Sequence, residues 1–335
     1  MPTSSPPVVG PERAALWQRE LAAAVRDIDE LCRLLGLAPA DLPAAAAGFP
    51  LLVPRGFVAR MRPRDPQDPL LLQVLPTSAE DRVVSGFTAD PLHEQEALAA
   101  PGLVHKYAGR ALLLAAPGCA VNCRYCFRRE FPYAESGATR AGIDAAVEAV
   151  AADGTLREVI LSGGDPLLLA DERLGELVGR IEAIPHVRRL RIHTRLPIVL
   201  PSRVTEELAD ILRRSRLACV VVVHANHPAE LDETVAAAMA RLTEARAILL
   251  NQSVLLAGVN DSADVLAALS ERLVDLGIVP YYLHLLDRVR GTAHFEVDES
   301  DARRLLDELR RRLSGYAVPR LARELPGEPA KLWIG

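Results

Sequence analysis

From about residue 101 onward, apolar residues gather in short continuous runs, and the stretches between these runs carry apolar residues three and four positions apart. The runs predict strands at 111–115, 158–161, 188–193, 218–224, 247–255 and 279–286. The intervening stretches predict helices at 140–152, 171–184, 203–214, 229–245 and 262–276, with Thr139 and Ser262 as caps and Gly277 ending the last one. Apolar strands that alternate with helices indicate an α/β fold with a parallel sheet covered by helices. Six such units favour a partial (β/α)6 barrel, although an open doubly wound sheet has the same pattern.

The two ends of the chain have a different pattern. One apolar stripe predicts a helix over 11–36 that Gly36 ends, and shorter helices near 54–61 and 69–75 follow among loops rich in proline and aspartate. A last amphipathic helix is predicted at 298–313. We therefore expect a helical accessory region at 1–100 with no visible chemistry, the barrel at 101–296, and a C-terminal helix and tail at 297–335.

Composition argues against several classes of protein. Half of the 335 residues are apolar and a quarter are charged, which is typical of a globular chain. The formal charge of −5 gives no bias toward nucleic acid, and no apolar run approaches the roughly 20 residues of a membrane helix. The first residues show no secretory signal, so we expect a reducing cytoplasm and neither a membrane nor a nucleic-acid partner.

A group of three cysteines with C-x3-C-x2-C spacing directly follows the first predicted strand of the barrel: Cys119, Cys123 and Cys126. Thiolates are soft ligands, and three of them in one loop favour an iron–sulfur cluster with one iron left open. A zinc site completed by His105 or by a histidine from 280–295 is an alternative, as is a disulfide beside a spare thiol. Cys32 and Cys219 lie in apolar stretches and are expected to be buried core residues.

Polar residues lie at or near the end of each predicted strand. After the cysteine loop they lie at 162–165, 193–195 and 224–227, within the fifth strand at 251–253, and near the end of the sixth strand at His284 and Asp287. Because the carboxyl ends of parallel strands meet at one edge, we expect these side chains to gather in one site. Gly163 and Gly164 are expected to let the backbone approach a ligand closely. His224 and His227 are three apart beside a strand and point to opposite faces, so pocket lining or helix capping is favoured over a shared metal.

Lysine is rare in this chain. Of the 39 lysine and arginine residues, only Lys106 and Lys331 are lysines. A primary amine can lose its proton and form an imine, which a guanidinium cannot do, so chemistry is worth suspecting at both positions. Lys331 follows glycine and prolines and precedes the apolar residues 332–334, so we expect the tail to pack against the fold.

Residues from about 105 to the end resemble the lysine 2,3-aminomutase family of radical S-adenosylmethionine (SAM) enzymes, and most of all the branch that makes (R)-β-lysine for elongation factor P. The stretches that carry the resemblance are 105–107, 119–129, 162–167, 191–197, 251–256 and 327–331, with further likeness at 55–57 and 68–71. The cysteine loop alone indicates only a radical SAM protein, whereas the ordered set is specific. The resemblance implies a radical SAM partial barrel with an N-terminal helical region and a short C-terminal extension.

The resemblance also implies three cofactors. The three cysteines of the loop hold a [4Fe–4S] cluster whose open iron binds SAM, and Lys331 forms an imine with pyridoxal phosphate. The residues implied around SAM are Ser162, Gly163, Gly164, Asp165, His193 and Arg195, with Gln252 also cofactor-binding, and those implied around pyridoxal phosphate are Lys106, Tyr107 and Arg110.

For the substrate, the resemblance implies that Arg128 binds the carboxylate through two hydrogen bonds and that Asp287 pairs with the ε-ammonium group. Glu324 lies where better-known aminomutases have a shorter aspartate, which leaves the fit of the amine open. The implied reaction is the 2,3-amino migration that turns free L-α-lysine into (R)-β-lysine, started by a 5′-deoxyadenosyl radical from SAM. A reductant such as flavodoxin and a ligase acting on elongation factor P are the implied partners.

Two other functions are open at this point. An aminomutase for another amino acid, such as glutamate, needs a cation opposite the side-chain carboxylate, and Asp287 argues against it. A non-catalytic iron–sulfur protein needs neither the glycine turn at 162–165 nor a packed lysine near the end of the chain.

Overall fold

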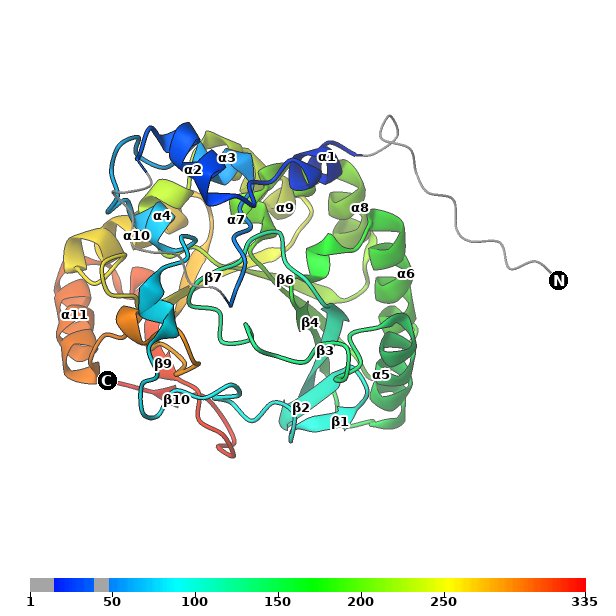
Figure 1. Ribbon diagram of the computed structural model, residues 1–335. Coiled ribbons are helices and arrows are strands. Elements are labelled where there is room, and N and C mark those ends of the chain that lie inside the picture. Colours follow the sequence, from blue (N-terminus) through cyan, green and yellow to red (C-terminus); the bar gives the residue numbers. More distant parts are fainter. Residues whose placement is uncertain (1–14, 39–47) are drawn as a thin grey trace.

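The computed structural model describes residues 15–38 and 48–335. Its centre is one curved sheet whose ten strands follow one another in chain order (Figure 1). The strands are β1 (Leu98–Ala100), β2 (Leu103–Tyr107), β3 (Arg110–Ala116), β4 (Glu158–Gly163), β5 (Arg189–Thr194), β6 (Ala218–Val223), β7 (Ile248–Val254), β8 (Val279–His284), β9 (Arg320–Arg323) and β10 (Leu332–Trp333). Because β1 and β10 are the edges of the sheet, the barrel is partial, as the sequence predicts.

Strands β3 to β9 are parallel, and an antiparallel hairpin completes each edge. At one edge β1 pairs with β2 and β2 with β3, and at the other β10 pairs with β9. Strands β3 to β8 confirm the six predicted strands, with ends that differ by a few residues. The sequence does not predict β9 and β10, because strands of four and two residues are too short to show the pattern of a strand.

Helices cross between consecutive parallel strands and cover the outer face of the sheet (Figure 1). They are α5 (Arg140–Ala152), α6 (Asp171–Glu182), α8 (Glu206–Arg214), α9 (Glu233–Glu244), α10 (Ala263–Asp275) and α11 (Glu299–Arg312), with the short α7 (Leu196–Val199) after β5. The predicted caps are confirmed: Thr139 accepts a hydrogen bond from Gly142 N at 3.1 Å, and Ser262 accepts one from Val265 N at 3.3 Å. Helices α8 and α9 begin three and four residues later than predicted, where Thr205 and Asp232 cap them.

The single helix predicted over 11–36 is wrong. The described part of this stretch forms α1 (Leu16–Ala22) and α2 (Ile28–Leu35), and residues 11–14 lie outside the described residues. The break has a tertiary cause, because Val25 exchanges two backbone hydrogen bonds with Val53 at 2.8 and 3.0 Å. Asp27 then caps α2, and Gly36 ends it with φ of +65°, as predicted.

The N-terminal helices share a hydrophobic core with the barrel. Helices α1 and α2, together with α3 (Arg55–Val58) and α4 (Pro69–Leu72), lie along one side of the barrel in Figure 1. One cluster of buried apolar side chains extends from Trp17 in α1 through Phe57 in α3 to Ile278 before β8. The division of the chain at 100 and 296 stays a prediction. Within the described ranges, we find no helix with the length and apolarity that crossing a bilayer requires.

Candidate active site

One cavity of about 480 Å³ contains every site residue that the sequence predicts. These residues are Lys106, Tyr107, Arg110, Cys119, Cys123, Cys126, Arg128, Ser162, Gly163, Gly164, Asp165, His193, Arg195, Gln252, Asp287, Glu324 and Lys331. Most of them come from the carboxyl ends of the parallel strands, from the loop after β3 and from the C-terminal tail, whereas Lys106 and Tyr107 lie on β2 and Arg110 begins β3. Their shared location supports a single site, and the role of each one stays a prediction.

The cysteine loop is held by a close backbone contact with the end of β4. Gly164 N donates to Ala116 O and Asp165 N donates to Gly118 O, both at 2.7 Å. A Cβ atom at Gly164 would lie 1.9 Å from Gly118 O, and Gly163 has φ of +120°. The packing of the cysteine loop therefore requires glycine at both positions, and the close approach to a ligand stays a prediction.

The three thiols of this loop line the cavity, while Cys32 and Cys219 are buried elsewhere. Burial raises the pKa of Cys126 to about 11 and raises that of Cys119 well above its usual value. Among the described residues, no three His, Cys, Asp or Glu side chains lie close enough to hold one metal ion.

Two predicted cofactor residues have their polar groups committed to the protein. The buried carboxylate of Asp165 accepts hydrogen bonds from Thr194 Oγ1 at 2.7 Å and from Arg195 N at 2.7 Å, and burial raises its pKa to about 6. The Arg195 guanidinium donates to Cys123 Sγ at 2.7 Å and to Glu230 at 3.0 Å. Both residues thus tie the ends of β4 and β5 to the cysteine loop. We call this part of the cavity lining, with Cys119, Cys123 and Cys126, the cysteine end.

Histidines supply neutral nitrogen atoms to the same wall. The Nε2 atom of His193 is buried and has no hydrogen-bond partner among the described residues, so it is available to a ligand. Burial, together with Arg191, lowers the pKa of His193 well below its usual value. His224 lines the cavity against Gln252, and His227 caps a 3₁₀ turn by accepting from Ala229 N at 3.1 Å, so the predicted lining and capping roles are confirmed.

A chain of consecutive ion pairs, which we call the ion chain, links Arg128 to Lys331 in the cavity lining. Arg128 pairs with Glu94 at 2.6 Å, Glu94 with Lys106 at 3.2 Å, Lys106 with Glu324 at 2.8 Å, and Glu324 with Lys331 at 2.9 Å. Burial acts to raise the pKa of Glu324, but Lys331 and Lys106 outweigh it and hold that pKa well below its usual range. We call Lys106, Glu324 and Lys331, with the adjacent Tyr107 and Arg110, the lysine end.

Glu94 is the one member of this ion chain that the sequence does not reveal. The first hundred residues are expected to hold no chemistry, yet this glutamate is 4% exposed and lines the cavity. It lies in a loop after Asp90, whose side chain accepts from Glu94 N at 3.1 Å. A turn at the Asp-Pro pair is readable from sequence, but a loop has no periodicity from which burial could be inferred.

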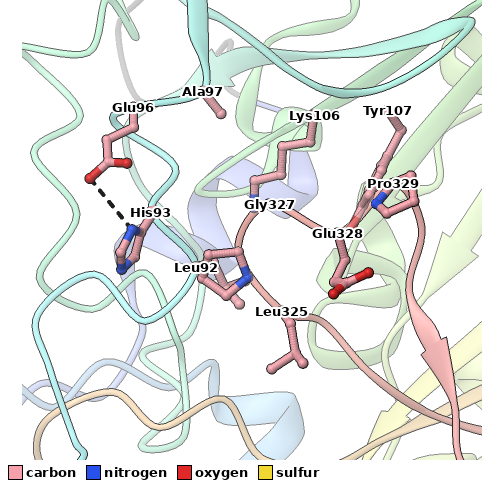
Figure 2. Close-up of a pocket in the computed structure, with 11 residues that line it drawn as sticks. Leu92, His93, Glu96, Ala97, Lys106, Tyr107, Leu325, Gly327, Glu328 and Pro329 are labelled. Atoms are coloured by element: carbon pink, nitrogen blue, oxygen red, sulfur yellow. Dashed lines mark ion pairs between the residues drawn. The ribbon is translucent and has the colours of Figure 1, made fainter.

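The lysine end also joins the two edges of the open sheet. Lys106 lies on β2 at one edge, whereas Glu324 and Lys331 flank the loop between β9 and β10 at the other. Outside this junction lies a second cavity of about 560 Å³, in which the loop residues Leu325, Gly327 and Glu328 face the segment around His93 (Figure 2). Leu92, Lys106 and Tyr107 line both cavities, so the lysine end borders this outer space.

Comparison with known proteins places the chain in a family. The model of the radical SAM superfamily matches residues 113–265. The L-lysine 2,3-aminomutase of Escherichia coli (strain K12) is 52% identical over 319 residues, which cover 94% of this chain and 93% of that protein.

The chain belongs to the L-lysine 2,3-aminomutase family. The aminomutase of Haemophilus influenzae is 46% identical with 94% of each chain covered, and that of Clostridium subterminale is 34% identical with 94% of this chain and 76% of that protein covered. A solved radical SAM methyltransferase from Sphaerobacter thermophilus has 20% identity and a TM-score of 0.45 over 66% of this chain and 68% of that chain. As a member of the aminomutase family, this chain is an isomerase.

The cofactors of the aminomutase family are a [4Fe–4S] cluster, SAM and pyridoxal phosphate. The cysteine end offers three thiols and the unsatisfied Nε2 of His193, which is a donor set that suits the first two. The lysine end offers the amine of Lys331 and the guanidinium of Arg110, which stacks 4.6 Å from the ring of Tyr107. Among the described residues Arg110 has no ion pair or hydrogen bond from its side chain, so its charge is available to a phosphate.

Proposed function

We propose that this aminomutase converts L-α-lysine into (R)-β-lysine by moving the 2-amino group to carbon 3, with pyridoxal phosphate as the carrier of that group. The observation that carries the proposal is one cavity that is lined both by three thiols and by Lys331, with Asp287 in its wall. The names of the relatives support lysine as the substrate class. When bound, the cluster and SAM supply a carbon-centred radical, and pyridoxal phosphate supplies an electron-accepting ring.

The protein residues bind and orient the two charged ends of the substrate. Arg128 is 6% exposed and lines the cavity, and its positive charge suits a carboxylate. Asp287 supplies a carboxylate for the ε-ammonium group. Among the described residues, the other acidic groups in the cavity wall are Glu94, Asp165 and Glu324. Each of those three is already paired or hydrogen-bonded inside the protein, so Asp287 is the acid best placed to receive a second amine.

Lys331 and Glu324 form the proton-handling pair of the site. Glu324 accepts a hydrogen bond from Lys331 Nζ at 2.9 Å, which orients the amine while the lysine is charged. Lys331 must lose a proton before it can act as a nucleophile toward the aldehyde of pyridoxal phosphate. The ion pair with Glu324 holds this amine, so we infer that rearrangement of the ion chain accompanies cofactor loading.

An aminomutase for glutamate is the second candidate, and no cation in the wall favours it over lysine. A side-chain carboxylate opposite Asp287 adds a repulsive contact in a buried site. Two observations argue against a protein that only transfers electrons. Such a protein does not need the residues of the lysine end, and the family assignment makes the chain an isomerase.

We propose further that the (R)-β-lysine serves the modification of elongation factor P through a ligase, and that a protein such as flavodoxin reduces the cluster in the cytoplasm. Support for this use comes from the likeness of the ordered sequence stretches to the branch that makes (R)-β-lysine. A cluster that must be reduced at low potential also suits a reducing compartment.

Anaerobic incubation with L-lysine, SAM and dithionite, followed by chiral analysis of the products, tests the proposal. We expect (R)-β-lysine from L-lysine and no β-glutamate from L-glutamate under the same conditions. Cleavage of SAM without any amino migration in lysine would contradict the proposed substrate, and the same mixture with L-glutamate identifies the alternative.

A further inference from the structure

The guanidinium of Arg128 is almost fully engaged by protein groups. Its Nε donates to Glu94 Oε2 at 2.6 Å and its Nη2 donates to Glu94 Oε1 at 2.9 Å, which is a two-point contact along one side of the guanidinium. Its Nη1 donates to Ser162 Oγ and to Gly163 O, both at 3.1 Å. An arginine has five N–H donors, so this arrangement leaves one, on Nη2.

This arrangement conflicts with the expectation that Arg128 binds the substrate carboxylate through two hydrogen bonds. The side that fits a carboxylate in that way already holds the carboxylate of Glu94, and both hydrogens of Nη1 are used. Glu94 is 4% exposed and also contacts Lys106 at 3.2 Å, so it is a fixed part of the wall.

We propose that Glu94 is a positioning residue of the substrate site, which occupies the two-point face of Arg128 and leaves the substrate carboxylate a single N–H donor. The inference rests on the proposed function, because it takes the carboxylate of lysine as the ligand of Arg128. Glu94 thereby fixes the guanidinium between itself and Ser162 and holds the carboxylate at one point. It also places a negative charge beside the carboxylate that binds there, which weakens the bound ground state.

A weaker ground state serves turnover in this site. The substrate and the product carry the same carboxylate, so tight binding at Arg128 stabilises both and does not accelerate the chemical step. A carboxylate gripped at two points also shifts the carbon skeleton away from the position that the single N–H sets. Replacing Glu94 is therefore expected to tighten lysine binding and to slow turnover at the same time.

The direct test is equilibrium binding of labelled L-lysine to the holoenzyme without a reductant, so that no turnover occurs. In Glu94→Gln the amide keeps the shape of the side chain, removes the opposing charge and leaves one N–H of Arg128 without its acceptor. We expect lysine to bind about tenfold more tightly than to the wild-type protein, and kcat and KM both to fall. A residue with only a structural role would lower the yield of folded enzyme and leave KM unchanged.

Two controls separate this effect from general damage. 1,5-Diaminopentane has both amines of lysine and no carboxylate, so its binding should be unchanged in Glu94→Gln. Glu80 is a matched buried glutamate, since it accepts two-point hydrogen bonds from Arg124 at 2.8 and 2.6 Å and one from Arg129 at 2.5 Å, but it does not line the cavity. Glu80→Gln should leave lysine binding per folded, iron-loaded protein unchanged.

Unchanged or weaker lysine binding in Glu94→Gln overturns the inference, as does an equal gain in the binding of 1,5-diaminopentane. If Glu94→Gln does not fold, Glu94→Asp carries the test, because the shorter carboxylate cannot reach both nitrogens and should give a smaller gain in affinity. A wild-type enzyme that neither binds nor isomerises lysine contradicts the proposed function itself. A wild-type enzyme that does both, with no gain in the variants, contradicts only the role of Glu94.

Discussion

The cysteine end and the lysine end of the cavity are held in place by different kinds of contact. At the cysteine end, backbone hydrogen bonds of 2.7 Å join the thiol-bearing loop to β4, and glycine is required where the two backbones meet. At the lysine end, ion pairs between side chains from β2 and the tail join the two edges of the sheet. A backbone contact keeps its geometry when ionisation changes, whereas an ion chain does not.

This difference indicates which end of the cavity is more sensitive to substitution and to pH. Removing one partner of a buried ion pair leaves an uncompensated charge and lowers the free energy of unfolding by about 3–5 kcal/mol. The net contribution of the intact pair to stability is small. We therefore expect the cysteine end to be preformed and the lysine end to respond to cofactor loading, to substitution and to pH. The sharpest test of this comparison is whether substitutions at one end abolish its function while the cofactor of the other end still binds.

The largest effect is expected from the cysteine loop. Cys126→Ala should abolish SAM cleavage, because two thiolates cannot secure a four-iron cluster. Iron content and the yield of 5′-deoxyadenosine measure the loss. Cys219→Ala is the control, since this buried thiol lies outside the cavity and should cost only packing stability. Loss of all iron from Cys219→Ala would contradict the ligand assignment.

Next in size is the effect of Lys331→Arg, which keeps the charge beside Glu324 but cannot form an imine. Lysine isomerisation should fall by roughly three orders of magnitude, and the visible absorption of lysine-bound pyridoxal phosphate should disappear. Iron content should stay at the wild-type level, because the expected ligands of the cluster are the three cysteine thiols and not Lys331. A variant that still isomerises lysine at the normal rate would remove Lys331 from the chemistry.

Much of this site could be predicted from the sequence, for two physical reasons. Parallel strands bring their carboxyl ends to one edge, so residues such as His193 and Asp287 could be grouped without knowing the tertiary structure. The scarcity of lysine singled out Lys331 and Lys106, which the ion chain indeed links through Glu324. Both inferences use local patterns that survive folding.

The contacts that the sequence could not reveal are tertiary. The burial of Glu94 depends on a loop that folds onto Arg128, and the break between α1 and α2 depends on the pairing of Val25 with Val53. Gly163 and Gly164 could be singled out from the sequence, but the atoms that a Cβ would meet there, Ala116 O at the end of β3 and Gly118 O in the cysteine loop, could not. Periodicity and spacing report on neighbours along the chain and carry no information about such partners.

A moderate effect is expected from Asp287→Asn. The amide keeps the shape of the side chain but loses the charge that pairs with the ε-ammonium group, so kcat/KM for lysine should fall about ten- to a hundredfold. Both cofactors should still bind, as absorbance and iron content would show. If lysine kinetics are unchanged in this variant, Asp287 does not contact the substrate and the assignment of the amine pocket is wrong.

The smallest effect is a dependence of lysine binding on pH. Burial, together with the nearby Glu324 and Glu94, outweighs the opposing effect of Lys331 and Lys106 and raises the pKa of Asp287 to about 7. Below pH 7 the carboxyl group is neutral and cannot pair with an ammonium ion, so the affinity for lysine should fall as the pH falls through 7, by up to about tenfold between pH 8 and pH 6. Equilibrium dialysis with labelled L-lysine measures this directly. In Asp287→Asn the weaker affinity should be flat over the same range, whereas a wild-type affinity that rises on acidification would place the titrating group elsewhere in the ion chain.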